Sequence, residues 1–127
     1  MENFKFQIIT LCLFYTVLAY SDDHNEIYRI NGKHYGFYKY KNSLLSINCR
    51  DKVKKCSAKK TLNSNLRVKL KKGALNGGRN PGAVVCKHLE NTHIVLAQSL
   101  DGNYQSFCVF KDKSMISANS LKKLIYK

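Results

Sequence analysis

Apolar and polar residues alternate over residues 26–40, which predicts two β-strands. The pair Asn31-Gly32 interrupts the alternation. It suits a two-residue type I′ turn, because both central residues of that turn require positive φ. With this turn, Tyr28 falls opposite Tyr35. The pattern therefore predicts a β-hairpin with a defined register.

Two further stretches of the chain show the same alternation. Leu45, Ile47 and Cys49 predict a third strand. Residues 66–71 alternate between apolar and basic side chains without interruption, which predicts a half-buried strand with a basic outer face. At a sheet edge, such charges would discourage aggregation without binding any ligand.

The second half of the chain begins with a helical pattern. Three glycines within residues 73–78 loosen the backbone and predict a linker over residues 73–79. Asn80 suits the N-cap of a helix, and Pro81 suits its first helical position. The buried stripe of this helix comprises Gly82, Val85, Cys86 and Leu89.

A β-meander is expected after this helix. Residues 93–98 and 104–110 predict two strands, joined by a turn at residues 101–102. A second turn at residues 112–113 leads into a third strand at residues 114–117. The three strands would then form one small antiparallel sheet.

The chain is expected to end in a short helix that Asn119 or Ser120 caps. Its inward residues would be Leu121, Leu124 and Ile125. Together the elements predict an α+β fold, with an N-terminal antiparallel sheet followed by a helix packed on the three-stranded meander. The expected segments are a signal peptide (1–21), a basic β-rich region (22–72), a Gly-rich linker (73–79) and a helix-plus-meander domain (80–127).

Residues 1–21 are typical of a signal peptide. Lys5 precedes an apolar run over residues 6–20, which is too short to span a bilayer comfortably. Ala19 and Ser21 are small residues that suit a cleavage site, so we expect cleavage after Ser21. An uncleaved N-terminal anchor is the alternative. With cleavage, the mature protein would be secreted or periplasmic and would lack a transmembrane anchor.

Removal of the signal peptide leaves four cysteines, and an even number in a short exported chain predicts two disulfides. Three pairings are possible. We favour Cys49–Cys56 and Cys86–Cys108, each within its own half of the chain. An unbroken helix would separate the Cα atoms of Cys49 and Cys56 by about 10 Å. The disulfide limit is about 7 Å, so this pair requires a loop or a broken helix.

The formal net charge is +14, and residues 50–72 hold ten Lys and Arg residues against one acid. A field of this sign attracts anions such as phosphate, nucleic acid, acidic glycans and lipid head groups. The alternative is a solvated basic face that keeps the protein in solution. The candidate polyanion-binding residues are Lys54, Lys55, Lys59, Lys60, Arg67, Lys69 and Lys71.

The aromatic and catalytic signals are weak. The tyrosines of the hairpin could stack on single-stranded nucleic acid, but cross-strand packing is the commoner role of such residues. Cys86 and His88 lie two residues apart and point to different sides of a helix, and disulfide formation would remove the nucleophile. A small basic nuclease would need His34 and His93 to meet. We expect no catalytic residue, no metal and no cofactor.

One segment resembles a known family. It reads Asn-Pro-Gly-Ala-Val-Val-Cys from Asn80, followed by a hairpin and then Cys-Val-Phe-Lys-Asp from Cys108. Residues 77–117 are similar to small exported bacterial domains of unknown function that often bear a provisional "hemolysin" label. Members carry Asn-Pro-Ala-x-x-Tyr-Cys and then Cys-Val-x-Pro-Asp-Gly, so Gly82 stands where Ala is usual. The resemblance implies an exported helix-plus-meander domain with a Cys86–Cys108 bridge.

These observations favour an exported, non-enzymatic binding or accessory protein. Its basic face would meet an anionic envelope surface or extracellular polymer, and nucleic acid is not excluded. The second hypothesis is an inhibitor or toxin-like effector directed at another protein. The third is a small basic secreted nuclease.

Overall fold

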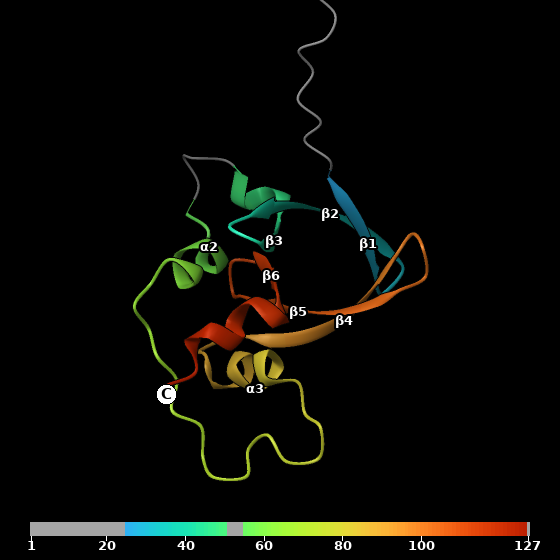
Figure 1. The fold of residues 1–127 in the computed structure, drawn as a ribbon. Helices are drawn as coiled ribbons and strands as arrows, with labels where there is room; N and C mark the ends of the chain where they lie inside the picture. The colour runs from blue at the N-terminus through green and yellow to red at the C-terminus, as the bar shows by residue number, and fades with distance from the viewer. Residues whose placement is uncertain (1–24, 51–54, 127) are drawn as a thin grey trace, which may run out of the picture.

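The computed structural model describes residues 25–50 and 55–126, which form a closed barrel of antiparallel strands with short helices at one end (Figure 1). The expected signal peptide and Lys54 lie outside the described residues. The strands are β1 (Glu26–Ile30), β2 (Lys33–Tyr40), β3 (Ser43–Ser46), β4 (His93–Ser99), β5 (Tyr104–Val109) and β6 (Met115–Ser117). The helices are α2 (Ser57–Leu62), α3 (Pro81–His88) and the 3-10 helices η1 (Ile47–Arg50) and η2 (Ala118–Leu124).

The predicted N-terminal hairpin is present in the predicted register. Tyr28 of β1 pairs with Tyr35 of β2. The turn between them places Asn31 at φ 50° and Gly32 at φ 79°, as a type I′ turn requires. The local signal of the Asn-Gly pair was therefore sufficient to define this hairpin.

The strand order around the barrel is β1-β2-β3-β6-β5-β4, and β4 also pairs with β1. The predicted α+β fold, with a separate N-terminal sheet, is therefore wrong. The meander β4-β5-β6 exists, but β3 joins it at Leu45↔Ile116 and β1 joins it at Arg29↔Gln98. Closure gives every edge strand a partner, and β4-β1-β2-β3 form a Greek key.

The barrel interior holds an aromatic trio. The ring of Tyr28 lies 5.5 Å from that of Phe37 and 5.1 Å from that of Phe107, and Phe37 stacks on Phe107 at 4.2 Å. These residues are buried together with residues from both halves of the chain, such as Leu44 and Met115. Both sets of strands therefore bury their apolar faces against each other, which explains why they close into one barrel.

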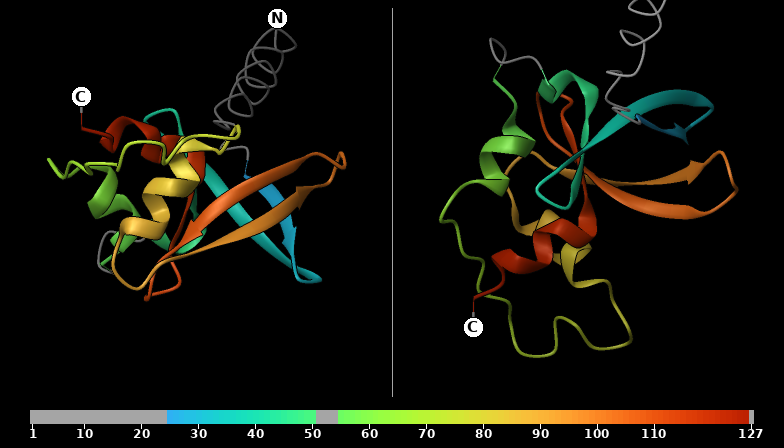
Figure 2. Two further views of the ribbon diagram at one scale, coloured as in Figure 1. Left: turned by 90° about the horizontal axis from the view of Figure 1, so that it is seen from below. Right: turned by 45° about the horizontal axis from the view of Figure 1, so that its top comes forward.

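A second core lies between the barrel and the helices. The hairpins β1-β2 and β4-β5 extend to one side, while α2, α3 and η2 gather at the other (Figure 2). Leu45, Val85, Ile116 and Leu121 are fully buried in this core. The helices therefore close one end of the barrel.

Helix α3 begins as predicted. The Asn80 side-chain oxygen accepts hydrogen bonds from the backbone N–H groups of Gly82 (2.9 Å) and Ala83 (3.2 Å). At Gly82 the helix lies directly against the backbone of Ala118 in η2, where a Cβ atom would stand 1.7 Å from the carbonyl oxygen. Glycine is therefore required for this helix–helix contact.

Three predicted elements differ from the structure. The strand expected at residues 66–71 is absent, and this segment makes only an isolated bridge between Val68 and Ile125. The third strand ends at Ser46, and η1 follows it. The final helix is present as a 3-10 helix, but Ser117 precedes it without a side-chain cap, so the expected cap at Asn119 or Ser120 is wrong. For residues 66–71, backbone hydrogen bonds between Val68 and the segment at Leu124 outweigh the local pattern.

Both favoured disulfides are present. Cys49–Cys56 and Cys86–Cys108 have Cα–Cα distances of 5.1 and 5.8 Å. As the pairing required, η1 and α2 are separate helices. Within the described residues, no helix has the length and apolar character needed to cross a membrane.

Candidate anion-binding site

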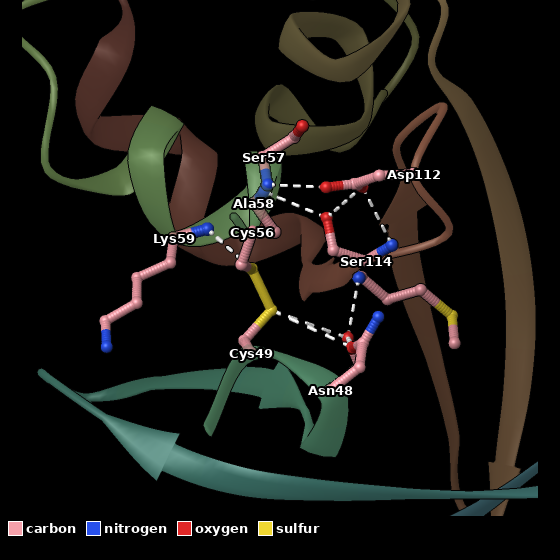
Figure 3. The surroundings of a disulfide bond; sticks show 10 residues. Asn48, Cys49, Cys56, Ser57, Ala58, Lys59, Asp112 and Ser114 are labelled. Atoms are coloured by element: carbon pink, nitrogen blue, oxygen red, sulfur yellow. Dashed lines mark hydrogen bonds between the residues drawn. A yellow bond between two sulfur atoms is a disulfide. The ribbon is translucent and has the colours of Figure 1, made fainter. Parts of the chain in front are cut away.

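Helix α2 has only six residues, and helices this short are not stable alone in water. Tertiary hydrogen bonds hold its first turn (Figure 3). The Ser57 N–H donates to the Asp112 carboxylate at 2.8 Å, and the Ala58 N–H donates to the Ser114 hydroxyl at 3.0 Å. The Lys59 N–H donates to the sulfur of Cys56 at 3.3 Å. The free N–H groups of this helix start are thereby satisfied by side chains of the turn before β6 and by a disulfide sulfur.

Asp112 holds the turn before β6 as well as α2. It accepts hydrogen bonds from the Ser114 N–H (3.0 Å) and hydroxyl (2.6 Å). Desolvation acts to raise the pKa of Asp112, but the hydrogen bonds from Ser114 and Ser57 outweigh it and lower the pKa below its ordinary value of 3.8. Asp112 is therefore a structural carboxylate.

The Cys49–Cys56 disulfide fixes α2 from the other side. Cys49 lies in η1, directly after β3, while Cys56 is the N-cap of α2 (Figure 3). Ala58 and Leu62 of α2 are buried in the second core. The helix is thus held at a defined place beside the β2-β3 turn.

This placement gathers four side chains that we call the Tyr40 cluster: Tyr40, Lys41, Lys59 and Asn63. The ammonium of Lys59 lies 4.7 Å from the centre of the Tyr40 ring, and that of Lys41 lies 5.5 Å from it. The Asn63 amide donates to the Tyr40 hydroxyl at 3.1 Å and accepts from the Lys41 ammonium at 3.0 Å. Two cations therefore converge on one phenol ring.

The cluster has a positive field. The hydrogen bond from Asn63, with the charges of Lys41 and Lys59, lowers the pKa of Tyr40 below its ordinary value of 10.0 although desolvation opposes the shift. A site that favours a phenolate also favours other anions. Each ammonium carries three donors, and the contacts described leave donors available to a ligand.

The structure gathers only part of the predicted basic set. Lys59 belongs to the Tyr40 cluster. Lys60 is exposed on the same helix, and Lys55 is exposed two residues before the helix begins. The basic residues of the predicted strand are exposed but do not belong to the cluster. Their segment lies beside η2, where the Val68 N–H donates to the Leu124 carbonyl at 2.7 Å. These basic residues are Arg67, Lys69 and Lys71.

Lys41 was not among the predicted residues, because it lies outside the basic window of residues 50–72. It stands with Asn42 in the tight β2-β3 turn, where both have positive φ, 47° and 61°. Lys122 and Lys123 of η2 are exposed and extend the basic surface. The Lys41-Asn42 pair could have indicated a turn between two strands. Nothing in the sequence, however, indicates that this turn lies beside α2.

The residues considered for catalysis do not come together. His34 pairs with Arg29, which lies opposite Gln98 of β4. His93 lies five residues earlier on β4, which places it about 17 Å along the strand. The histidines therefore lack the geometry for joint acid–base catalysis.

The other chemistries lack the groups they need. All four cysteines after residue 21 form disulfides, so the Cys86 thiolate is not available as a nucleophile. Among the described residues, no group of three or more His, Cys, Asp or Glu side chains is placed to hold a metal ion. Tyr28 and Tyr38 are buried, as cross-strand packing predicts, and do not form a stacking platform.

Comparisons with protein-family models, curated proteins and solved structures found no match to this chain. The resemblance of residues 77–117 to exported bacterial domains stays a prediction.

Proposed function

We propose that this is an exported, non-enzymatic binding or accessory protein that contacts an anionic surface or polymer. The observation that carries the proposal is the Tyr40 cluster, in which Lys41 and Lys59 are held by a phenol and an amide. These neutral partners position the ammonium groups without neutralising them. Two positioned cations bind an anion at a smaller cost in side-chain entropy than two mobile ones.

The surrounding charge supports the same role. Lys60 is exposed on α2 and Lys55 is exposed just before it, and the whole chain carries a net charge of +14. Asp112 carries the negative charge bonded to this helix, and its oxygens accept hydrogen bonds from Ser57 and Ser114. The two disulfides suit a protein that works in the periplasm or outside the cell.

Heparin titrations at several salt concentrations test the proposal. The variant Lys41→Gln/Lys59→Gln should bind more weakly than the wild type, with a flatter dependence of affinity on salt. Each lost contact with a flexible polyanion should remove about 0.7 from the slope of log K against log salt. The matched control is Lys33→Gln/Lys87→Gln, which removes the same charge from exposed positions outside the cluster.

The control separates a site from general charge. Equal losses in the two double variants would contradict a site at the Tyr40 cluster. No heparin binding by the wild type at about 0.15 M salt, where the Debye length is about 8 Å, would contradict polyanion binding altogether. Salt-insensitive capture of a protein partner would instead favour the inhibitor or effector hypothesis.

A further inference from the structure

A polar groove adjoins the Tyr40 cluster at Lys41. It consists of two open hollows, of about 420 Å³ and about 360 Å³. Gln105 and Asn119 line both hollows, which therefore adjoin each other. We call this feature the amide groove. Lys41 and Lys123 line the larger hollow, while Tyr104 lines the smaller one.

Among the residues that the structure describes, the lining is rich in amides and hydroxyls and contains no carboxylate. Asn42, Gln105 and Ser120 line the larger hollow, and Asn80 and Asn119 line the smaller one. Amide and hydroxyl groups both donate and accept hydrogen bonds, which matches ligands that carry many hydroxyl groups. The two lysines add a preference for negative charge on such a ligand.

Internal hydrogen bonds hold several groove side chains in place. The Asn119 oxygen accepts from the Asn80 amide at 3.1 Å, and the Gln105 oxygen accepts from the Tyr28 hydroxyl at 2.9 Å. These bonds use the carbonyl oxygens of Asn119 and Gln105 and leave their amide donors for a ligand. The Ser117 and Ser120 hydroxyls bond each other at 2.7 Å. Fixed polar groups of this kind favour selective binding.

The smaller hollow also offers an apolar platform. Tyr104 and Leu96 are 66% and 61% exposed, although both are large apolar side chains. In the β4-β5 register, Tyr104 pairs with Gln98 and Leu96 pairs with Ser106, so they are diagonal neighbours on one face. An exposed aromatic ring beside amide donors suits a sugar ring, which presents C–H groups on its faces and hydroxyls at its edge.

We propose that the amide groove binds an acidic oligosaccharide. Tyr104 packs against one sugar ring, the amides of Gln105 and Asn119 bond its hydroxyls, and Lys41 and Lys123 pair with a carboxylate or sulfate. This inference rests on the proposed function, because Lys41 belongs both to the Tyr40 cluster and to the groove. The inference restricts the anionic partner to an acidic glycan, whereas the proposed function allows any negatively charged polymer.

Titration with two probes tests the inference: a short polyuronate oligosaccharide and an inorganic polyphosphate. Tyr104→Ala and Asn119→Ala should each weaken polyuronate binding about 3- to 10-fold, which is the loss of one net hydrogen bond or its equivalent. Polyphosphate binding should not change. The matched controls are Tyr126→Ala, which removes a tyrosine that is 64% exposed, and Asn65→Ala, which removes an exposed amide outside the groove.

Each outcome bears on the groove separately from the cluster. If the groove variants weaken neither probe while Lys41→Gln/Lys59→Gln weakens both, the groove inference is overturned and the proposed function stands. Equal weakening of both probes, or loss equal to that of the controls, also overturns a sugar site. If the wild type binds polyphosphate only, the glycan is excluded. If it binds neither probe, the groove inference fails, and the heparin titration decides the proposed function. Unchanged thermal midpoints of the variants exclude a folding defect.

Discussion

Gly82→Ala should destabilise the protein, although alanine is the better helix former. Glycine costs about 1 kcal/mol relative to alanine inside a helix, so propensity alone predicts stabilisation. The close contact with η2 predicts the opposite. The added Cβ would stand 1.7 Å from the Ala118 carbonyl oxygen and 2.4 Å from its carbonyl carbon.

The magnitude follows from what must move. Contacts of Cβ below 3.0 Å essentially never occur, so α3 and η2 must separate by at least 1.3 Å, the difference between 1.7 and 3.0 Å. Both contacts involve backbone, so no rotamer change relieves them. Overpacking of a core costs about 1–3 kcal/mol, and we expect the upper end here. After the gain of about 1 kcal/mol in helix propensity, the net loss is about 2 kcal/mol.

Urea unfolding and thermal melts measure this loss. For a domain of this size, about 2 kcal/mol corresponds to a fall of roughly 8–16 °C in Tm. The urea midpoint should fall while the m-value stays constant, because the surface exposed on unfolding hardly changes. Ala83→Gly, the reverse exchange at the next residue of α3, calibrates the propensity effect at about 1 kcal/mol.

A Gly82→Ala protein that is as stable as the wild type, or more stable, would refute the reasoning. The result also bears on the resemblance to exported bacterial domains, in which alanine is usual at this position. Destabilisation here would mean that α3 lies closer to its neighbour in this chain than a domain with alanine at this position allows.

The remaining predictions concern α2 and the disulfides. Asp112→Asn should cost about 1 kcal/mol at neutral pH, because it weakens the bond that caps α2. Because the pKa of Asp112 is lowered in the folded state, the ionised carboxylate stabilises the protein fully at pH values above the ordinary pKa of 3.8. This stabilisation is lost as the pH falls through the folded-state pKa. Urea unfolding should therefore give the variant and the wild type the same stability in acid. A constant difference at all pH values would contradict this role. Cys86→Ala/Cys108→Ala should lower Tm more than Cys49→Ala/Cys56→Ala. The two bridges close loops of 22 and 7 residues, which differ by about 1 kcal/mol in loop entropy, and the Cys86–Cys108 bridge is fully buried. Equal losses of Tm, or the reverse order, would contradict this prediction. Cys49→Ala/Cys56→Ala should nevertheless cause the larger loss of heparin affinity, because this bridge holds α2 and Lys59 beside Tyr40, and unchanged affinity in a folded variant would contradict that link.

Local signals predicted the elements that depend on neighbouring residues. Asn31-Gly32 defined the first hairpin, and Asn80 with Pro81 defined the start of α3. The meander strands followed from alternation and turn residues. In each case the physical cause lies within a few residues of the element, so a single sequence carries enough information.

Closure of the barrel depends on pairing between the two halves of the chain, which alternation does not encode. Leu45 and Ile116 pair although they lie 71 positions apart in the sequence, and nothing in either strand identifies the other as its partner. The strand predicted at residues 66–71 is absent for the same reason. An alternating segment forms a strand only where the edge of a sheet is free to pair with it. Their backbone instead meets η2 at Val68.

The candidate site was predicted in part. Lys59 was found because it lies within a dense basic window, whereas Lys41 was missed because it lies on a different hairpin. The Cys49–Cys56 pairing was predicted, but it did not reveal that α2 would lie against Tyr40. Sites that combine a turn with a distant helix require the tertiary structure.

The most direct test of the central claim is to locate the anion on the protein. In ¹⁵N-resolved NMR spectra of the oxidised protein, heparin should first shift the amides of Tyr40, Lys41 and residues 59–63 at the end of α2, at about 0.15 M salt. The exposed lysines Lys33 and Lys87 should stay unaffected at the same concentrations. Shifts spread evenly over all basic residues, or confined to residues outside the Tyr40 cluster, would contradict the account.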